Sequence, residues 1–157
     1  LNEIEKAAAS EKVKMAAELQ YCLPGVPCIY YGDENGMEGY IDPFCRKCFD
    51  WDNLNEDLIS YYKNLGEIRT LFRKVFAKGL YKELYVKNGF FLFQRSYNGT
   101  QVYIYTNNSS EGLFVKISGK FHDYLNDKEF ENFMEIKPHT FGIRKSCILR
   151  IVFPVPH

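Results

Sequence analysis

The spacing of apolar residues changes at Gly79, and this change constrains the fold more than any other feature. Before Gly79, apolar residues recur at three- and four-residue steps, which is the pattern of a helix: Leu58, Tyr62, Leu65, Phe72 and Phe76. Asn53 or Asn55 can cap this helix. After Gly79, apolar and polar residues alternate, and Asn-Gly pairs at 88–89 and 98–99 separate the alternating runs. The chain therefore combines a helical first part with a second part made of β-hairpins.

A short apolar run interrupts the helical part. The first helix follows a clear pattern from Ser10, which can act as its N-cap, and it must end at Pro24. Residues 26–31 are apolar, β-branched and aromatic, which predicts a strand buried on both faces. An acidic, glycine-rich loop follows at 32–36, and in parallel α/β folds such loops lie where ligands bind. The expected order is helix, strand and helix.

The second part predicts an antiparallel β-sandwich. Its expected strands cover residues 80–86, 90–96, 100–106, 113–117, 121–125, 131–136 and 140–145. Short strands at near-regular spacing, with turn residues between them, are typical of this architecture. We expect Pro138-His139 to form the last hairpin, and residues 147–157 can add an edge strand. The predicted division is residues 1–78 and 79–157.

The segment between the two helices resembles a known family. The matching residues run Gly25-Val26-Pro27-Cys28-Ile29-Tyr30-Tyr31-Gly32-Asp33-Glu34, then Gly36-Met37-Glu38-Gly39, Asp42-Pro43, Arg46 and Trp51. They are similar to the α-amylase family of glycoside hydrolases, and most similar to its neopullulanase, cyclomaltodextrinase and maltogenic amylase branch. The resemblance implies that residues 1–78 are the C-terminal end of a catalytic (β/α)₈ barrel, and that residues 79–157 are the β-sandwich called domain C.

The resemblance also implies an activity and a site. The intact enzyme would hydrolyse α-glucosidic bonds in maltooligosaccharides, cyclodextrins, pullulan or starch, through the retaining mechanism of the family. Asp42 and Arg46 match the family's DPxxR element, which is associated with gripping sugar hydroxyls. A carboxylate and a guanidinium are suited to that task, although the two can equally pair with each other to hold the loop.

No catalytic residue is expected within this chain. The family's catalytic carboxylates come from barrel strands that precede the matching segment, and His122-Asp123 lies in the β region, away from the matching position. Asp33 and Glu34 are adjacent, so they point to different sides of the chain and are expected mainly to organise the loop. Trp51 can serve as a platform for a sugar ring, although a Trp that packs in the barrel is the commoner case. The chain by itself is therefore expected to be inactive.

The composition limits the kinds of binding partner that are expected and indicates a cellular compartment. Lys plus Arg and Asp plus Glu both number 20, so the zero formal charge argues against nucleic-acid or membrane-surface partners. Five cysteines without the density of a secreted scaffold indicate free thiols and a cytoplasmic location. Cys45 and Cys48 have the spacing of zinc or redox sites, but without a second such pair neither a metal nor a cofactor is expected.

Two further expectations remain open. A barrel strand without its neighbours would expose an unpaired edge, which predicts local disorder or a homo-oligomer. The alternative function is a stand-alone β-sandwich module that binds carbohydrate or another protein.

Overall fold

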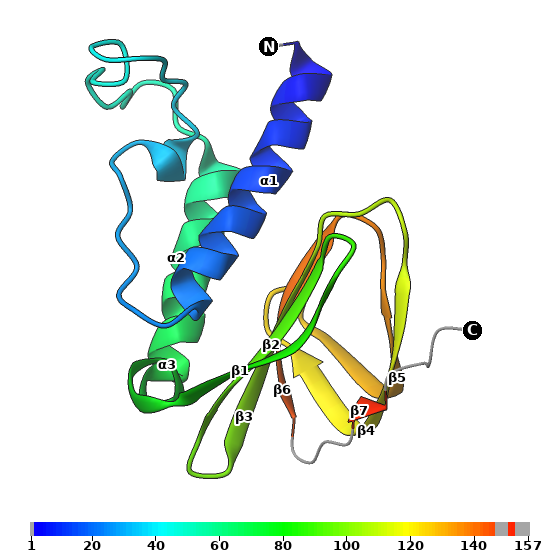
Figure 1. The fold of residues 1–157 in the computed structure, drawn as a ribbon. Helices are drawn as coiled ribbons and strands as arrows, with labels where there is room; N and C mark the ends of the chain where they lie inside the picture. Colours follow the sequence, from blue (N-terminus) through cyan, green and yellow to red (C-terminus); the bar gives the residue numbers. More distant parts are fainter. Residues whose placement is uncertain (1, 147–150, 153–157) are drawn as a thin grey trace.

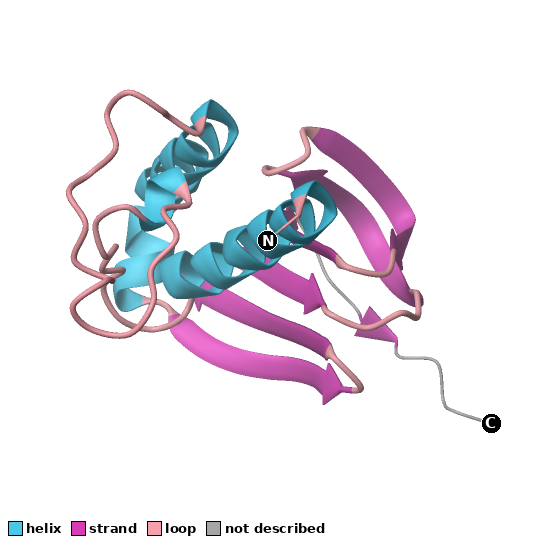
Figure 2. Cartoon of the chain, turned by 90° about the horizontal axis from the view of Figure 1, so that it is seen from above, coloured by secondary structure: helices cyan, strands magenta, loops and turns pink. Residues whose placement is uncertain are grey.

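A computed structural model describes residues 2–146 and 151–152 (Figure 1). The helical elements are α1 (Glu3–Cys22), the short 3₁₀ helix η1 (Asp33–Asn35), α2 (Glu56–Leu71) and α3 (Arg73–Lys78). The strands are β1 (Leu80–Lys87), β2 (Phe90–Tyr97), β3 (Thr100–Asn107), β4 (Leu113–Asp123), β5 (Lys128–Ile136), β6 (Thr140–Ser146) and β7 (Ile151–Val152). Figure 2 shows the helices side by side on one face of the sheet. In the described part of the chain, no helix is long and apolar enough to cross a membrane.

The first helix begins earlier than its apolar pattern indicates. Asn2 accepts a hydrogen bond from the Glu5 amide, and the Glu5 side chain accepts one from the Asn2 amide. This reciprocal pair satisfies two amides that the first turn otherwise leaves open. The prediction of Ser10 as the N-cap is therefore wrong, because a capping box lies eight residues upstream.

The second helical pattern corresponds to two helices in succession. Asn55 caps α2 by accepting a hydrogen bond from the Leu58 amide. Of the two predicted caps, Asn53 and Asn55, the structure therefore confirms Asn55. The helix is interrupted at Phe72, where φ is −101° and ψ is 27°, and α3 then continues to Gly79. The predicted end at Gly79 is confirmed.

The described strands form one antiparallel sheet in the order β1-β2-β3-β6-β4-β5, with β7 paired to β4. Both Asn-Gly hairpins are confirmed, because Asn88, Gly89, Asn98 and Gly99 all have positive φ, as a tight two-residue turn requires. The antiparallel prediction holds, and the strands are continuous within a single sheet.

Two details of the predicted strands are wrong. The strands predicted at 113–117 and 121–125 are a single strand, β4, which ends at Asp123 and leaves residues 124–125 in the following turn. This strand carries an irregularity in register between Lys116 and Lys120. The Pro138-His139 connection is not a hairpin, because β6 pairs with β3 and β4 while β5 pairs only with β4. Strands that are neighbours in the sequence are therefore separated in the sheet by β4.

The strand predicted at residues 26–31 is absent. These residues form no helix or strand, and Val26 is 91% exposed. A strand buried on both faces needs hydrogen-bonded neighbours in its own sheet. The described sheet is antiparallel throughout and does not include this segment. The apolar run therefore lies outside the sheet and is largely open to solvent.

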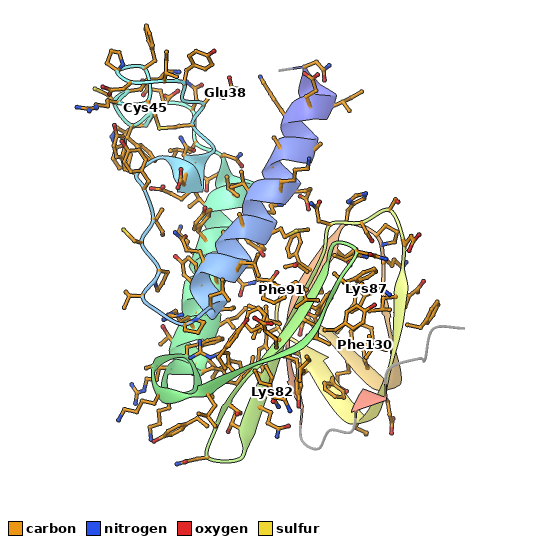
Figure 3. The ribbon with its side chains drawn as sticks, in the orientation of Figure 1. Glu38, Cys45, Lys82, Lys87, Phe91 and Phe130 are labelled. Carbon is orange, nitrogen blue, oxygen red and sulfur yellow. The ribbon has the colours of Figure 1, made fainter. Side chains whose placement is uncertain are left out.

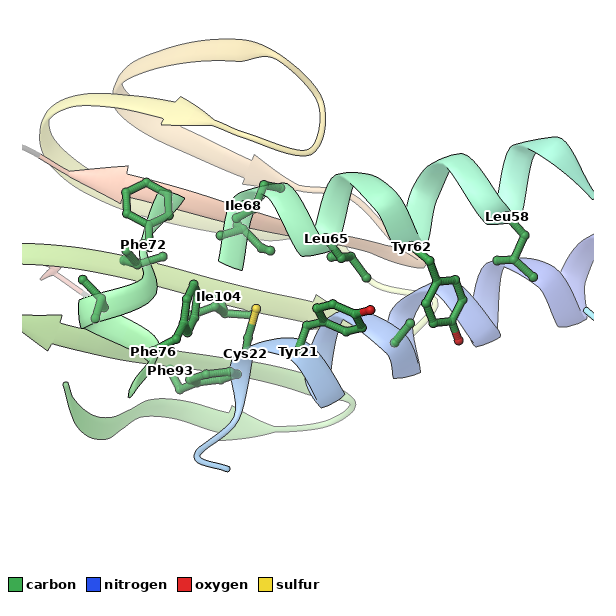
Figure 4. Close-up of a cluster of buried hydrophobic side chains, with 14 residues drawn as sticks. Tyr21, Cys22, Leu58, Tyr62, Leu65, Ile68, Phe72, Phe76, Phe93 and Ile104 are labelled. Atoms are coloured by element: carbon green, nitrogen blue, oxygen red, sulfur yellow. The ribbon is translucent and has the colours of Figure 1, made fainter. Parts of the chain in front are cut away.

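The larger core joins the helices to the sheet (Figure 4). Its helical side includes Leu65 and Ile68 of α2, and its sheet side includes Phe93 of β2 and Ile104 of β3. Tyr21 and Cys22 bring the end of α1 into the same cluster. The two predicted parts of the chain therefore share one hydrophobic core.

A second core fills the opposite face of the same strands. Leu92 and Tyr105 point away from the helices and pack with Val115 of β4 and Ile136 of β5. Since β4 and β5 are not neighbours of β2 in the sheet, the sheet must curl to bring these side chains together. Strands β2 and β3 are consequently buried on both faces.

Gly142 is required where Tyr105 crosses β6. The two residues are paired in register, and a Cβ at position 142 would lie 2.6 Å from the Tyr105 hydroxyl oxygen. Tyr105 is only 4% exposed, so its ring has little room to move. We expect Gly142→Ala to lower the free energy of unfolding by about 1–3 kcal/mol, as overpacking does. Urea unfolding of the purified protein measures this cost.

Gly66 provides the matched control. It lies within α2, and a Cβ there would meet no atom within 4 Å. Gly66→Ala should therefore raise stability by about 0.5–1 kcal/mol, since alanine is the better helix former. Equal effects at positions 66 and 142 would contradict the argument from Tyr105.

Candidate functional site

Every residue of the α-amylase-like motif lies in the segment between α1 and α2, here called the connecting loop (residues 23–55). Its far part, with Glu38 and Cys45, extends away from the β-sheet beyond the N-terminal end of α2 (Figures 1 and 3). Side-chain contacts with backbone groups determine its course.

Two arginines hold the start of the loop at the end of α1. The Arg69 guanidinium donates to the Tyr21 carbonyl and, at 2.6 Å, to the Gly25 carbonyl. Arg95 donates to the Cys22 carbonyl at 3.0 Å. Cationic groups are favourable at this position, because carbonyls at a helix C-terminus carry partial negative charge. The Gln20 side chain of α1 donates to the Cys28 carbonyl, further along the loop, at 2.6 Å.

Asn35 ties the middle of the loop to the start of α2. Its side chain is buried, donates to the Asp50 and Asn53 carbonyls at 3.2 and 3.3 Å, and accepts from the Asn55 amide at 2.6 Å. The sequence reasoning missed this residue. The available signal was its position between Gly32 and Gly36, two glycines that frame a tight turn.

We expect Asn35→Ala to loosen the connecting loop without unfolding the core. The variant loses three hydrogen bonds and leaves the Asn55 amide without its acceptor, at a local cost of about 1–3 kcal/mol. Hydrogen exchange should show faster exchange in residues 33–55 and unchanged exchange in β2 and β3. Asn64→Ala on α2 is the control, and equal exchange in the two variants would contradict the assigned role.

The acidic turn around η1 is organised by its own residues. Gly32 and Gly36 flank it with φ of 93° and 65°, a left-handed conformation that glycine tolerates best. Glu34 accepts from the Gly32 amide at 2.9 Å, and the Gly36 amide donates to the Asp33 carbonyl. The prediction that these acidic residues organise the loop is confirmed for Glu34.

Asp42 and Arg46 lie together in the far part of the loop. Arg46 Nε is 2.7 Å from Asp42 Oδ1, and both side chains are more than 60% exposed. The peptide bond from Asp42 to Pro43 is cis, and the Arg46 amide donates to the Pro43 carbonyl. The pair thus makes the loop-holding contact and still offers polar atoms to solvent.

A second set of contacts closes this part of the loop around Lys47. Its ammonium group donates to the Glu38 carbonyl at 2.9 Å, and its carbonyl accepts from the Tyr31 hydroxyl at 3.0 Å. A pocket of about 470 Å³ lies beside these contacts, within the size range of small-ligand sites. Its lining residues are Asn35, Gly36, Met37, Glu38, Lys47, Cys48, Asp50 and Asn53.

Aromatic side chains on the loop are exposed. Trp51 is 76% exposed and lies 4.5 Å from the ring of Phe49, measured between centroids. Tyr40 and Phe44 are exposed by 78% and 62%. Packing of Trp51 in a barrel stays a prediction, because within this chain the surrounding loop leaves the indole exposed.

By their chemistry, the thiols and carboxylates of the connecting loop and of β4 are candidate metal ligands within residues 2–146 and 151–152. Among the described residues, no group of three or more His, Cys, Asp or Glu side chains is placed to hold a metal ion. Cys28, Cys45 and Cys48 are free thiols on the loop, and Cys22 is a free thiol in the core. Asp123, the last residue of β4, is buried and accepts from the Leu125 and Asn126 amides of the following turn.

The chain is similar in sequence to cyclomaltodextrinases, amylopullulanases and maltogenic amylases. It is 35% identical over 142 residues to a cyclomaltodextrinase of Thermoanaerobacter pseudethanolicus, a match that covers 85% of this chain and 24% of the relative. It is 33% identical over 90 residues to an intracellular maltogenic amylase of Bacillus subtilis, covering 55% and 15% of the two chains. No family model matches the sequence.

A solved structure agrees with this relationship. The α-amylase of Anoxybacillus superposes with a TM-score of 0.80 at 25% identity, covering 87% of this chain and 32% of that enzyme. The chain is therefore homologous to the glycosidases of the α-amylase family. Within that family it resembles cyclomaltodextrinases, amylopullulanases and maltogenic amylases, and it spans about a quarter of the length of the cyclomaltodextrinase relative.

Proposed function

We propose that these residues are the C-terminal portion of an α-amylase family glycosidase that hydrolyses α-glucosidic bonds in maltooligosaccharides, cyclodextrins, pullulan or starch. The similarity to the cyclomaltodextrinase over 142 residues carries this proposal. Residues 1–78 would complete the catalytic barrel, and residues 79–157 would form the β-sandwich domain C. The catalytic carboxylates would then lie upstream, and the 157 residues alone would not cleave glucan.

The proposed role of the connecting loop is to line the substrate cleft. Asp42 and Arg46 are exposed on a loop whose course is held by Asn35 and Lys47. Sugar hydroxyls can both donate to the carboxylate and accept from the guanidinium, and hydrogen bonds to charged groups contribute about 1.5–3 kcal/mol each. The exposed apolar side chains of the loop would be covered by the rest of the barrel.

Two experiments test the assignment. An antiserum raised against these residues should detect a gene product several times heavier than 18.4 kDa. A band at that mass would overturn the enzyme proposal and leave the alternative of a binding module. In the full-length product, Arg46→Met should raise KM for maltooligosaccharides about tenfold. Arg73→Met on α3 is the control, and equal KM values in the two variants would exclude Arg46 from the cleft.

The proposed location is the cytoplasm. Cys22, Cys28, Cys45 and Cys48 are free thiols, which suits a reducing compartment. The Bacillus subtilis relative is named as an intracellular enzyme. Fractionation of source cells tests the location, and recovery of the protein in the external medium would contradict it.

We further propose that the isolated 157 residues self-associate. Val26, Ile41 and Trp51 are exposed by 91%, 69% and 76% on one loop, and exposed apolar surface of this kind drives association. Size-exclusion chromatography with light scattering should detect species heavier than the monomer. A monodisperse monomer of 18.4 kDa would contradict this proposal.

A further inference from the structure

Four consecutive residues, Cys45 to Cys48, carry most of the contacts that hold the far part of the connecting loop. Arg46 pairs with Asp42, and the Lys47 side chain and carbonyl contact Glu38 and Tyr31. The Cys45 thiol itself lies 3.9 Å from Asp42 Oδ1. A change in the backbone of this segment would therefore disturb all of these contacts at once.

Both thiols at the ends of this segment are reduced and accessible. Cys48 is exposed and Cys45 is partly exposed. They lie on the same short segment of the loop and are separated only by Arg46 and Lys47. Two residues between the cysteines allow a small ring to close without movement of the helices or the sheet.

We infer that Cys45 and Cys48 form a redox-active dithiol whose oxidation to a disulfide switches the glucan-binding loop. The oxidant is a small-molecule disulfide such as oxidised glutathione. The Cys45 thiolate attacks one of its sulfurs and releases one thiol, and the Cys48 thiolate then attacks the Cys45 sulfur and releases the second. The protein sulfurs lose two electrons, and the two released thiolates take up the two protons.

The disulfide would alter the substrate contacts through Arg46. Closing the ring restricts the backbone of Arg46 and Lys47. It also removes the proton of the Cys45 thiol, which then can no longer donate to Asp42 Oδ1. The Asp42–Arg46 pair is exposed and held by local contacts, so its geometry has no buried core to preserve it. Exposed disulfides are also the readily reduced, regulatory kind, which suits a reducing compartment. This regulation rests on the proposed function of the loop.

Trypsin offers a direct test, because it cleaves after Arg46 and Lys47, between the two cysteines. The full-length protein is equilibrated in glutathione buffers of increasing oxidation, its free thiols are alkylated, and the digest is examined by mass spectrometry. We expect the peptides of residues 15–46 and 48–63 to remain joined under oxidising conditions and to separate after dithiothreitol. Cys28→Ser should keep the linkage, and Cys45→Ser should abolish it.

Kinetics then test the switch. The oxidised enzyme should show a KM for maltooligosaccharides several-fold above that of the reduced enzyme, and Cys45→Ser should remove this difference. Absence of the joined peptides at every glutathione ratio would overturn the dithiol, and equal KM values in the two states would overturn the switch. Absence of hydrolysis in both states would refute the proposed function, while the peptide result would still decide whether the dithiol exists.

Discussion

The free energy of unfolding should fall by about 4 kcal/mol between pH 10 and pH 12. Burial raises the pKa of Tyr62 to about 12, with a further rise from the charge of Asp33. Burial also raises the pKa of Tyr103 to about 12, against an opposing effect of its hydrogen bond from Gln94. Tyr62 and Tyr103 are 7% and 4% exposed, so a phenolate at either position has little access to water.

The sign follows from proton binding. Above the usual tyrosine pKa of 10.0, the unfolded chain releases these protons while the folded chain keeps them. The folded state is therefore fully stabilised below pH 10, and this contribution disappears as the pH rises through 12. Two units for each of two tyrosines, at about 1.4 kcal/mol per unit, give a total loss of about 5.6 kcal/mol. About 4 kcal/mol of this total is lost between pH 10 and pH 12, because the folded tyrosines are only half titrated at pH 12. The buried Cys22 thiol, whose pKa burial raises well above 9.0, acts in the same direction.

Urea unfolding at a series of pH values measures this loss. Tyr62→Phe should remove one titrating group and make the decline shallower, with little change at pH 7. Tyr103→Phe should do the same but also lose about 1 kcal/mol at pH 7, because the Tyr103 hydroxyl bonds Gln94 and Gln101. A slope in Tyr62→Phe equal to that of the parent protein would refute the assignment.

Local sequence signals predicted the elements that short-range chemistry determines. Asn88 and Asn98 adopt the positive φ that an Asn-Gly turn requires, and Asn55 caps α2 with its own side chain. These features need only a few adjacent residues. The pairing of β6 with β3 and β4 could not be predicted in this way, because it depends on which faces the two cores bury.

The same distinction explains the outcome at the site. The Asp42–Arg46 contact was one of two alternatives, since a spacing of four residues permits it but does not require it. The prediction of a strand at 26–31 was wrong because an apolar run forms a buried strand only beside other strands of a sheet. The described sheet does not include this segment. Asn35 was missed because its position between Gly32 and Gly36 indicates a tight turn but does not indicate the three distant backbone groups that its side chain bonds.

Among the polar side chains, Arg95 is the one whose replacement should lower the free energy of unfolding most. It extends from β2, is 3% exposed, and donates to the Cys22 carbonyl of α1 and the Phe76 and Gly79 carbonyls near the end of α3. Burial lowers its pKa, and Arg69 contributes to the same shift. A guanidinium nonetheless remains charged in proteins, and its fork can reach several carbonyls at once.

We expect Arg95→Met to lower the free energy of unfolding by about 3–5 kcal/mol, because methionine fills similar space but leaves buried carbonyls without donors. Urea unfolding measures the change. The free energy of unfolding of Arg95→Lys should lie between those of the parent protein and of Arg95→Met. An ammonium group keeps the charge but lacks the forked geometry of the guanidinium. Arg73→Met, on the exposed side of α3, should stay within about 0.5 kcal/mol of the parent. If Arg95→Met matched that control, the helices and the sheet would be held by the apolar core alone, and Arg95 would have no part in fixing where the connecting loop begins.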